Sequence, residues 1–88
     1  MLEREIRIIN PLGLHARAAA KLVRCSVRFQ SSVRLARDGT TADAKSILSV
    51  LAMAAGFGTT VKITIDGPDE EEVMKEVVVL FLSGFGEI

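Results

Sequence analysis

Alternating apolar and polar residues recur in three segments, and this pattern limits the possible fold more than any other feature of the sequence. In residues 2–9, Ile6 and Ile8 alternate with charged side chains, and residues 33–35 and 61–66 show the same period. A period of two is typical of a β-strand with one buried face. We therefore expect at least three strands, each with one face in the core.

A fourth strand is indicated by the dipeptide Asp38-Gly39, which favours a type I′ turn. It separates the strand around Val33 and Leu35 from residues 40–44. These two segments are expected to pair as a β-hairpin.

The segments between the strands favour helices. Residues 16–29 have Ala19, Leu22, Val23 and Ser26 on one side of a helix, and a basic stripe on another side, formed by Arg17, Lys21, Arg24 and Arg28. Ser46 is expected to be the N-cap of a short helix over 47–54, closed by Gly56.

A last helix is expected to begin after Asp69 and to end near Gly84. Asp69 is the expected cap, with Glu72 at the capping-box position. The apolar stripe of this helix is formed by Val73, Val77, Leu80 and Phe81.

The element order is thus βαββαβα, and 88 residues are enough for one domain, residues 1–88. We expect an α+β fold, an open-faced two-layer sandwich. Its four-stranded, mainly antiparallel sheet would carry three helices on one face.

Composition excludes several classes of protein. About half of the residues are apolar and a quarter are charged, which argues against a disordered chain. The longest apolar stretches are much shorter than the roughly 20 residues of a membrane span, and residues 1–5 lack the apolar run of a secretory signal. The single cysteine, Cys25, cannot form an internal disulfide and fits a reducing compartment. We expect a cytoplasmic protein with no direct membrane insertion.

The net charge is zero, but the two parts of the chain differ in sign. Residues 1–45 contain nine basic and four acidic residues, whereas residues 46–88 contain two basic and seven acidic ones. This asymmetry favours a binding face for an oppositely charged partner. Nucleic acid is not the expected partner, because the chain has no Tyr or Trp for base stacking.

The segment Gly13-Leu14-His15-Ala16-Arg17 combines residues suited to one kind of chemistry. His15 is the only histidine and comes where a turn meets a helix. The backbone amides of Ala16 and Arg17 would lack intrahelical partners, and with the helix dipole they make an anion site. The Arg17 guanidinium suits phosphate oxygens, and Gly13 leaves space for an incoming group. These features suit reversible phosphorylation of a neutral imidazole.

No other reactive group is expected beside His15. The sequence suggests no carboxylate base, metal site or cofactor there, so partner enzymes would supply the catalysis. A lone histidine at a helix start is also a common capping or surface residue. From the residues alone, both interpretations stay open.

Three motifs resemble the HPr family, the histidine phosphocarriers of the bacterial phosphotransferase system. They are Gly13-Leu14-His15-Ala16-Arg17, Ala44-Lys45-Ser46-Ile47 and Gly67-Pro68-Asp69-Glu70-Glu71-Glu72, and the resemblance covers essentially the whole chain without gaps. The resemblance implies an open-faced sandwich fold. It also implies that the protein carries a phosphoryl group and is not an enzyme. Enzyme I would transfer the phosphoryl group from phosphoenolpyruvate to His15, Arg17 would stabilise it, and a IIA protein would receive it.

The resemblance does not decide the branch of the phosphotransferase system. Ala18 stands where HPr proteins usually have proline, and Leu12 and Ser83-Gly84-Phe85 are similar to NPr, the carrier of the nitrogen-related branch. Both sugar transport and the nitrogen-related branch stay open.

Two surfaces are expected to bind partners. Lys21, Arg24 and Arg28 would dock acidic proteins, although such a stripe can also be a solvated face. The resemblance implies an apolar contact patch at Ile47, Leu48 and Leu51, which could otherwise belong to the core.

Ser46 has two interpretations, a simple helix cap and a regulatory site phosphorylated by a serine kinase. The alternative functions are a regulatory binding module controlled by Ser46 phosphorylation and a generic small binding domain. We expect a monomer.

Overall fold

The alternating segments form the strands of the computed structural model, which describes residues 1–88. The elements follow in the order β1 (Leu2–Arg7), α1 (Ala16–Ser26), β2 (Ser32–Arg37), β3 (Thr40–Asp43), α2 (Ile47–Met53), β4 (Thr60–Asp66), α3 (Glu70–Leu82) and a short 3₁₀ turn, η1 (Gly84–Gly86). The predicted βαββαβα order and α+β class are confirmed. None of the helices is long and apolar enough to cross a membrane.

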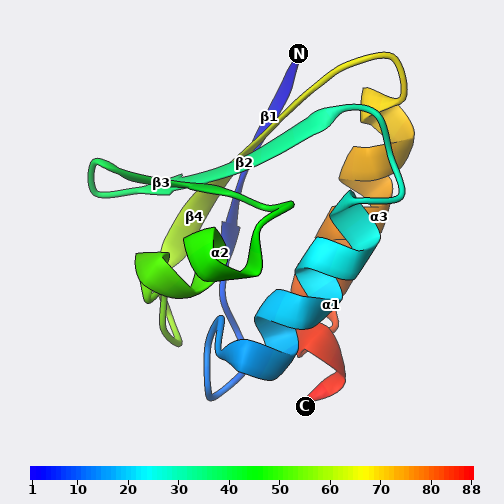
Figure 1. The fold of residues 1–88 in the computed structure, drawn as a ribbon. Helices are drawn as coiled ribbons and strands as arrows, with labels where there is room; N and C mark the ends of the chain where they lie inside the picture. The colour runs from blue at the N-terminus through cyan, green and yellow to red at the C-terminus, as the bar shows by residue number, and fades with distance from the viewer.

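The four strands form one antiparallel sheet in the order β1-β4-β2-β3 (Figure 1). β4 lies between β1 and β2, with Leu2 opposite Ile65 and Ser32 opposite Asp66. The helices cover one face of this sheet: α1 and α3 lie side by side, and α2 packs against β3 and α1. The other face has no covering layer, as expected for an open-faced sandwich.

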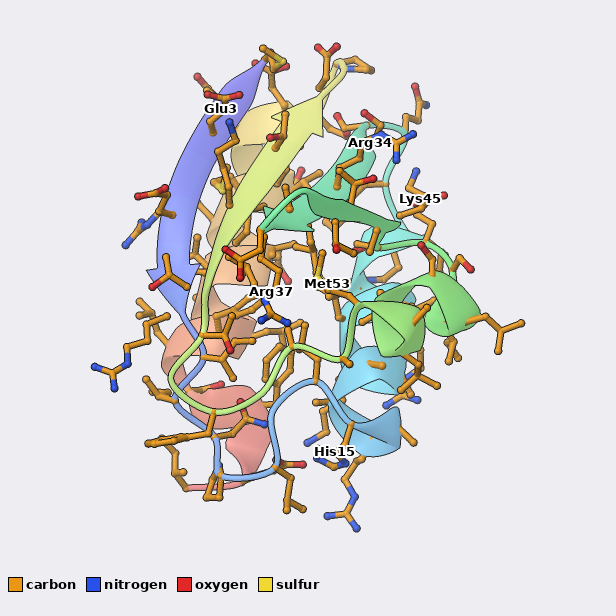
Figure 2. All side chains as sticks on the ribbon, turned by 90° about the vertical axis from the view of Figure 1, so that its left-hand side faces the viewer. Glu3, His15, Arg34, Arg37, Lys45 and Met53 are labelled. Carbon is orange, nitrogen blue, oxygen red and sulfur yellow. The ribbon has the colours of Figure 1, made fainter.

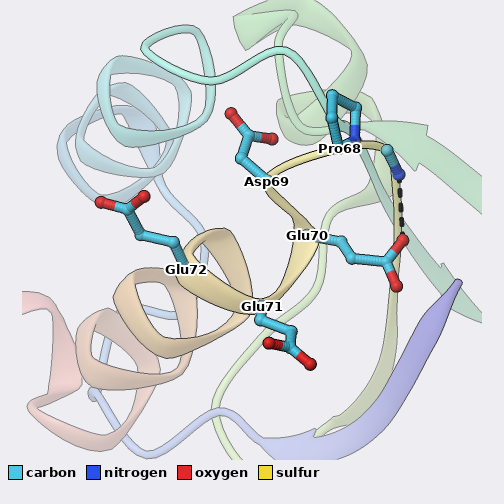
Figure 3. Close-up of a pocket in the computed structure, with 6 residues that line it drawn as sticks. Pro68, Asp69, Glu70, Glu71 and Glu72 are labelled. Atoms are coloured by element: carbon cyan, nitrogen blue, oxygen red, sulfur yellow. Dashed lines mark hydrogen bonds between the residues drawn. The ribbon is translucent and has the colours of Figure 1, made fainter.

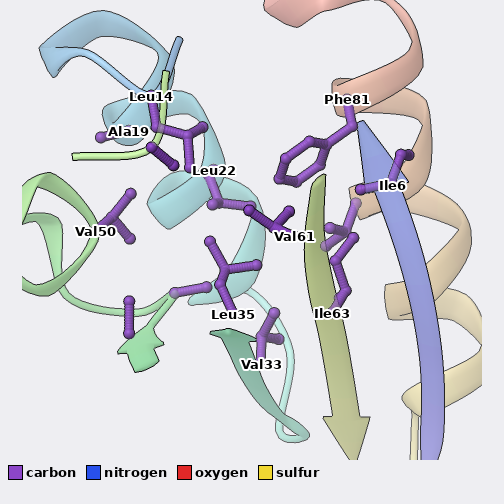
Figure 4. Close-up of a cluster of buried hydrophobic side chains, with 14 of the residues drawn as sticks. Ile6, Leu14, Ala19, Leu22, Val33, Leu35, Val50, Val61, Ile63 and Phe81 are labelled. Carbon is purple, nitrogen blue, oxygen red and sulfur yellow. The ribbon is translucent and has the colours of Figure 1, made fainter. Parts of the chain in front are cut away.

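The core lies between the sheet and the helices (Figure 4). Val61, Ile63 and Ile65 of β4 are fully buried, as the period of two predicted. From the helices, Leu22, Val73, Val77 and Phe81 are buried against them, and Leu80 of the predicted stripe is only partly buried. Each buried aliphatic side chain contributes roughly 1.5–3 kcal/mol, so this layer supplies most of the stabilising free energy.

The turn between β2 and β3 confirms the hairpin prediction. Asp38 and Gly39 have φ angles of 45° and 78°, which are the two positive values of a type I′ turn. The pairing of Arg37 with Thr40 leaves only these two residues in the loop.

Several predicted boundaries were wrong, and local hydrogen bonds explain them. β1 ends at Arg7 instead of residue 9, because Ile8 bonds the backbone of Gly58 and Thr59 outside the sheet ladder. α1 ends at Ser26 instead of Phe29, where the Arg28 and Phe29 amides form tighter turns to Cys25 and Ser26.

The end of α2 also differs from the prediction. The helix stops at Met53, and Ala54, not Gly56, takes the left-handed conformation, with φ 52°. Arg37 donates a hydrogen bond of 3.4 Å to the Met53 carbonyl, so a side chain from β2 satisfies one of the last carbonyls of the helix (Figure 2).

Asp69 occupies the N-cap position of α3, but the expected capping bond is absent. Its carboxylate instead accepts hydrogen bonds from the Gln30 amide, the Ser31 amide and the Ser31 hydroxyl. Glu72 forms no capping box; Glu70 accepts a bond of 3.1 Å from the Gly67 amide (Figure 3). Asp69 therefore ties the start of α3 to the loop before β2, because two amides and a hydroxyl of that loop lie within hydrogen-bond distance of its carboxylate.

Candidate functional site

The loop before α1 holds His15 at the N-cap of the helix. Gly13 has a φ of 65°, and a Cβ atom added there would lie 2.6 Å from the Ala55 carbonyl oxygen. The next amide, of Leu14, donates to that same oxygen over 2.9 Å. Close backbone contact therefore requires glycine here. The sequence suggested a different reason, namely space for an incoming group. His15 follows as an extended N-cap residue at the start of α1 (Figure 2).

The two ring nitrogens of His15 have different surroundings. Nδ1 accepts a long hydrogen bond of 3.4 Å from the Arg17 amide, so this nitrogen faces the start of the helix. Nε2 lies 2.5 Å from Oε2 of Glu87. The ring is a quarter exposed. The expectation that no carboxylate accompanies His15 was wrong, since the Glu87 carboxylate lies against its ring. The sequence did not reveal this contact because Glu87 is 72 residues away in the chain and no local motif marks it.

A buried amide holds the Glu87 carboxylate in place. Nδ2 of Asn10, which is fully buried, donates to the Gly13 carbonyl over 2.7 Å and to Oε1 of Glu87 over 2.9 Å. The hydrogen bond from Asn10, followed by that from His15, holds the pKa of the Glu87 carboxyl below its usual value. Glu87 is therefore ionised near neutral pH and acts as an acceptor towards both neighbours.

The C-terminal turn η1 brings Glu87 to this position. Phe85 is buried, has a left-handed φ of 55°, and packs edge to face on Phe81 with ring centroids 5.0 Å apart. Lys21 of α1 donates a hydrogen bond of 2.6 Å to the Phe85 carbonyl. The aromatic contact and the lysine bond together fix the turn against α1 and α3.

A shallow hollow lies beside these residues. It is lined by Pro11, Leu12, Arg17, Lys21, Gly86 and Glu87. The Arg17 side chain is exposed and forms no ion pair, so its guanidinium is available to an anion. An anionic group on Nδ1 would meet the amide end of α1 and this guanidinium.

Two side chains of the predicted basic stripe have partners within the protein, and the other two have none. Arg28 pairs with Glu76 at 3.1 Å, approaches the Cys25 sulfur at 3.7 Å and lies 5.2 Å from the centre of the Phe29 ring. Lys21 is bound to the C-terminal turn. Arg24 is exposed without an ion-pair partner, so Arg17 and Arg24 are the available cations of the stripe.

The predicted apolar patch lies on α2. Ile47 and Leu48 are 42% and 80% exposed, whereas Leu51 is half-buried against the core. Ser46 is the N-cap of α2, as predicted: its Oγ accepts a hydrogen bond of 3.2 Å from the Ser49 amide. Its side chain is not buried, so the hydroxyl is both a cap and partly accessible.

A second hollow is formed wholly by residues 67–72 at the start of α3 (Figure 3). It is rimmed by acidic side chains and contains no basic or aromatic residue. In Figure 1 the start of α3 and the start of α1 lie at opposite ends of the molecule. No three His, Cys, Asp or Glu side chains are grouped closely enough to hold a metal ion.

Asn10 and Glu87 are the site residues that sequence reasoning missed. The available signals were an aromatic residue between two glycines, Gly84-Phe85-Gly86, which marks a tight turn, and a polar residue directly before Pro11. Neither signal says that the turn folds back onto the start of α1.

Comparisons with known proteins identify a family and confirm the fold. Residues 2–82 match the family described as the PTS HPr component phosphorylation site. Phosphocarrier protein HPr of Cupriavidus necator is 51% identical over 87 residues, which cover 99% of this chain and 98% of that protein. Phosphocarrier protein NPr of Escherichia coli is 38% identical and covers 98% of this chain and 97% of its own length. The crystal structure of HPr-C-His from Thermoanaerobacter tengcongensis superposes with a TM-score of 0.96 at 40% identity, covering 100% of this chain and 99% of that one.

The fold, the histidine at a helix N-terminus and these similarities define a phosphocarrier, a protein that carries a phosphoryl group and is not itself a catalyst. The chain belongs to the HPr family of the phosphotransferase system.

Proposed function

We propose that His15 is the phosphoryl acceptor and that Nδ1 is the accepting atom. The observation that carries this proposal is the difference between the two ring nitrogens. Nε2 is occupied by the Glu87 carboxylate at 2.5 Å, whereas Nδ1 faces the first amides of α1. A phosphoryl group on Nδ1 would lie at the positive end of the helix dipole, near the backbone of Ala16 and Arg17.

Arg17 stabilises the phosphorylated state in this proposal. Its exposed guanidinium follows His15 by two residues and has no competing carboxylate within ion-pair distance. Arginine presents several N–H donors in a plane that fits phosphate oxygens. Removing it should slow transfer without unfolding the protein, because the side chain contributes no core packing.

The donor in this proposal is enzyme I, and the receiver is a IIA protein of the sugar or the nitrogen-related branch. The exposed cations Arg17 and Arg24 and the exposed patch at Ile47 and Leu48 would contact these proteins in the cytoplasm. Lys21, Arg28 and Leu51 would contribute less directly, since each has internal partners. The protein would act as a monomer.

The test is transfer of labelled phosphate from phosphoenolpyruvate in the presence of enzyme I. We expect one phosphoryl group that is labile in acid and stable in alkali. Labelling of a His15→Ala variant to the same extent would refute the proposal. Offering the labelled protein to a sugar-type and a nitrogen-type IIA protein, and comparing the two rates, assigns the branch.

A second proposed function is regulation at Ser46. The hydroxyl caps α2 and lies next to the exposed Ile47 and Leu48. A phosphate added there by a serine kinase would be at a helix N-terminus, which favours negative charge, so the fold should persist. It would repel an acidic partner at the apolar patch. If authentic Ser46 phosphorylation leaves the kinetics with enzyme I unchanged, Ser46 is only a cap.

A further inference from the structure

We propose that Glu87 is a positioning residue for phosphoryl transfer at His15: it keeps the ring proton on Nε2, so that the lone pair of Nδ1 is the nucleophile, and it balances the positive charge that the ring acquires. This inference rests on the proposed function, because it requires His15 to be the acceptor. It adds a role for a residue that no sequence motif marks.

The contact itself determines where the proton lies. An ionised carboxylate can only accept hydrogen bonds. A separation of 2.5 Å between Nε2 and Oε2 of Glu87 therefore requires the proton to be on Nε2. In a neutral ring only one nitrogen carries a proton, so Nδ1 is unprotonated, and its lone pair is directed towards the start of α1, where the Arg17 amide donates a long hydrogen bond of 3.4 Å to it.

The carboxylate is held in this orientation from both sides. Asn10 donates to Oε1 over 2.9 Å, and its amide group cannot turn over, because the same Nδ2 also donates to the Gly13 carbonyl over 2.7 Å. The backbone before Glu87 is fixed by the buried Phe85 and by the bond from Lys21. The Glu87 side chain is only 11% exposed, so solvent screens the contact with His15 weakly.

The charge balance of the reaction gives the carboxylate its second role. The Nδ1 lone pair forms a bond to phosphorus, while the bond from phosphorus to the leaving atom of the donor breaks and its electron pair departs with the donor. The ring keeps its Nε2 proton and so becomes positively charged. The Glu87 carboxylate lies against that proton and stabilises the charge as it develops, as the aspartate of a Ser-His-Asp triad does.

The orientation of Asn10 makes one substitution diagnostic. In Glu87→Gln, the single carbonyl oxygen of the new side chain would accept from Asn10, and its NH₂ group would then face His15. An amide donor there requires a bare Nε2, which moves the ring proton to Nδ1 and blocks the nucleophile. Glu87→Ala merely removes the contact. The glutamine variant should therefore be slower than the alanine variant, although it is closer to glutamate in shape.

The experiment measures initial uptake of labelled phosphate from phosphoramidate, a small donor that needs no docking surface. We expect Glu87→Ala to be about ten-fold slower than the wild-type protein. Glu87→Gln should be slower again by about ten-fold or more. Imidazole ¹⁵N spectra should show the proton on Nε2 in the wild-type protein and on Nδ1 in Glu87→Gln.

Matched controls separate this role from net charge and from folding. Glu72 is exposed and forms no ion pair, so Glu72→Ala and Glu72→Gln make the same charge change and should retain the wild-type rate. Backbone amide spectra verify that the Glu87 variants are folded. Equal rates for Glu87→Ala and Glu87→Gln, or a wild-type rate for Glu87→Gln, would overturn the inference alone. Wild-type uptake by His15→Ala would overturn the proposed function and this inference with it.

Discussion

Lys21 and Phe85 are joined by a hydrogen bond of 2.6 Å, from the lysine ammonium to the phenylalanine carbonyl, and this bond links α1 to the turn that carries Glu87. The same lysine was predicted from its place in the basic stripe to contact partners. Its internal bond indicates that part of the stripe supports the site from within the protein.

Replacing this lysine should loosen the C-terminal turn. In Lys21→Met the apolar stem is kept and the donor is lost, so we expect a loss of about 1 kcal/mol in the free energy of unfolding. For a chain of this size that lowers the melting temperature by roughly 4–8 °C. Hydrogen exchange at the Gly86 and Glu87 amides should also quicken. Arg24→Met removes a cation without an internal partner and should leave both measurements unchanged.

Gly13 should be far less tolerant of substitution than its φ angle alone suggests. In Gly13→Ala the new methyl would lie 2.6 Å from the Ala55 carbonyl oxygen, and the left-handed backbone would also be strained. We expect a cost of about 2–4 kcal/mol in urea unfolding. Gly39→Ala is the control, because it has a similar φ of 78° but open space around it, and should cost about 1 kcal/mol. Equal costs would mean that the contact with Ala55 does not matter.

The bonds at Asp69 should make part of the stability depend on pH. Donation from the Ser31 hydroxyl, then from the Gln30 amide, holds the pKa of the Asp69 carboxyl below its usual value. The folded state therefore prefers the ionised form, and this stabilisation is present above the unfolded pKa of about 3.9. It is lost as the pH falls from there through the lower folded value.

Asp69→Asn should therefore differ from the wild-type protein in a pH-dependent way. The gap between their melting temperatures should be widest near neutral pH and should narrow below about pH 4. Asp38→Asn is the control, since asparagine also suits the first position of a type I′ turn. A gap that stayed constant through the acid range would show that the Asp69 charge plays no part.

Arg24 should act on the rate of association with enzyme I. The side chain is exposed and unpaired, so its effect is mainly electrostatic steering, which is screened over about 10 Å at 0.1 M salt. Arg24→Glu should slow phosphoryl transfer at low salt, and the deficit should shrink as salt is added. An unchanged rate at low salt would mean that the stripe is only a solvated face. A deficit that does not change with salt would mean that Arg24 contacts enzyme I directly and does not act by steering.

Leu48 should act through dissociation of the complex. It is 80% exposed, so Leu48→Ala should leave the melting temperature unchanged. If docking buries the side chain, the substitution should weaken the free energy of binding to the partner by about 1–2 kcal/mol. This loss should be nearly independent of salt. Leu51→Ala provides the contrast, because that half-buried side chain packs on the core and its loss should lower the melting temperature first.

The sequence was sufficient for those features that local pattern controls. The period of two located the strands, and Asp38-Gly39 located the hairpin because its turn depends on only two residues. His15 at the helix start followed from the turn residues before it, and Ser46 from its capping chemistry. Three local motifs were also enough to show the resemblance to the HPr family, which the comparisons confirm.

The features that could not be predicted depend on contacts between distant parts of the chain. Asp69 could satisfy the α3 amides or the Gln30 and Ser31 amides, and only the approach of the loop before β2 decides between them. Glu87 is a glutamate near the end of the sequence, and its role depends on the fold of a turn fixed by Phe85 and Lys21. Ends of helices are similarly decided by tertiary hydrogen bonds, as Arg37 and Met53 illustrate.

The strand order β1-β4-β2-β3 has a consequence for how the protein folds as it is made. The first strand has one neighbour only, and that neighbour ends at Asp66. During synthesis β1 therefore leaves the ribosome without a strand to pair with, and the hairpin of β2 and β3 can close well before it. At translation rates of about 5–20 residues per second, β1 stays unpaired for some seconds. In the nascent chain Ile6, which lies opposite Val61 of β4, is thus open to chaperones and proteases until β4 emerges.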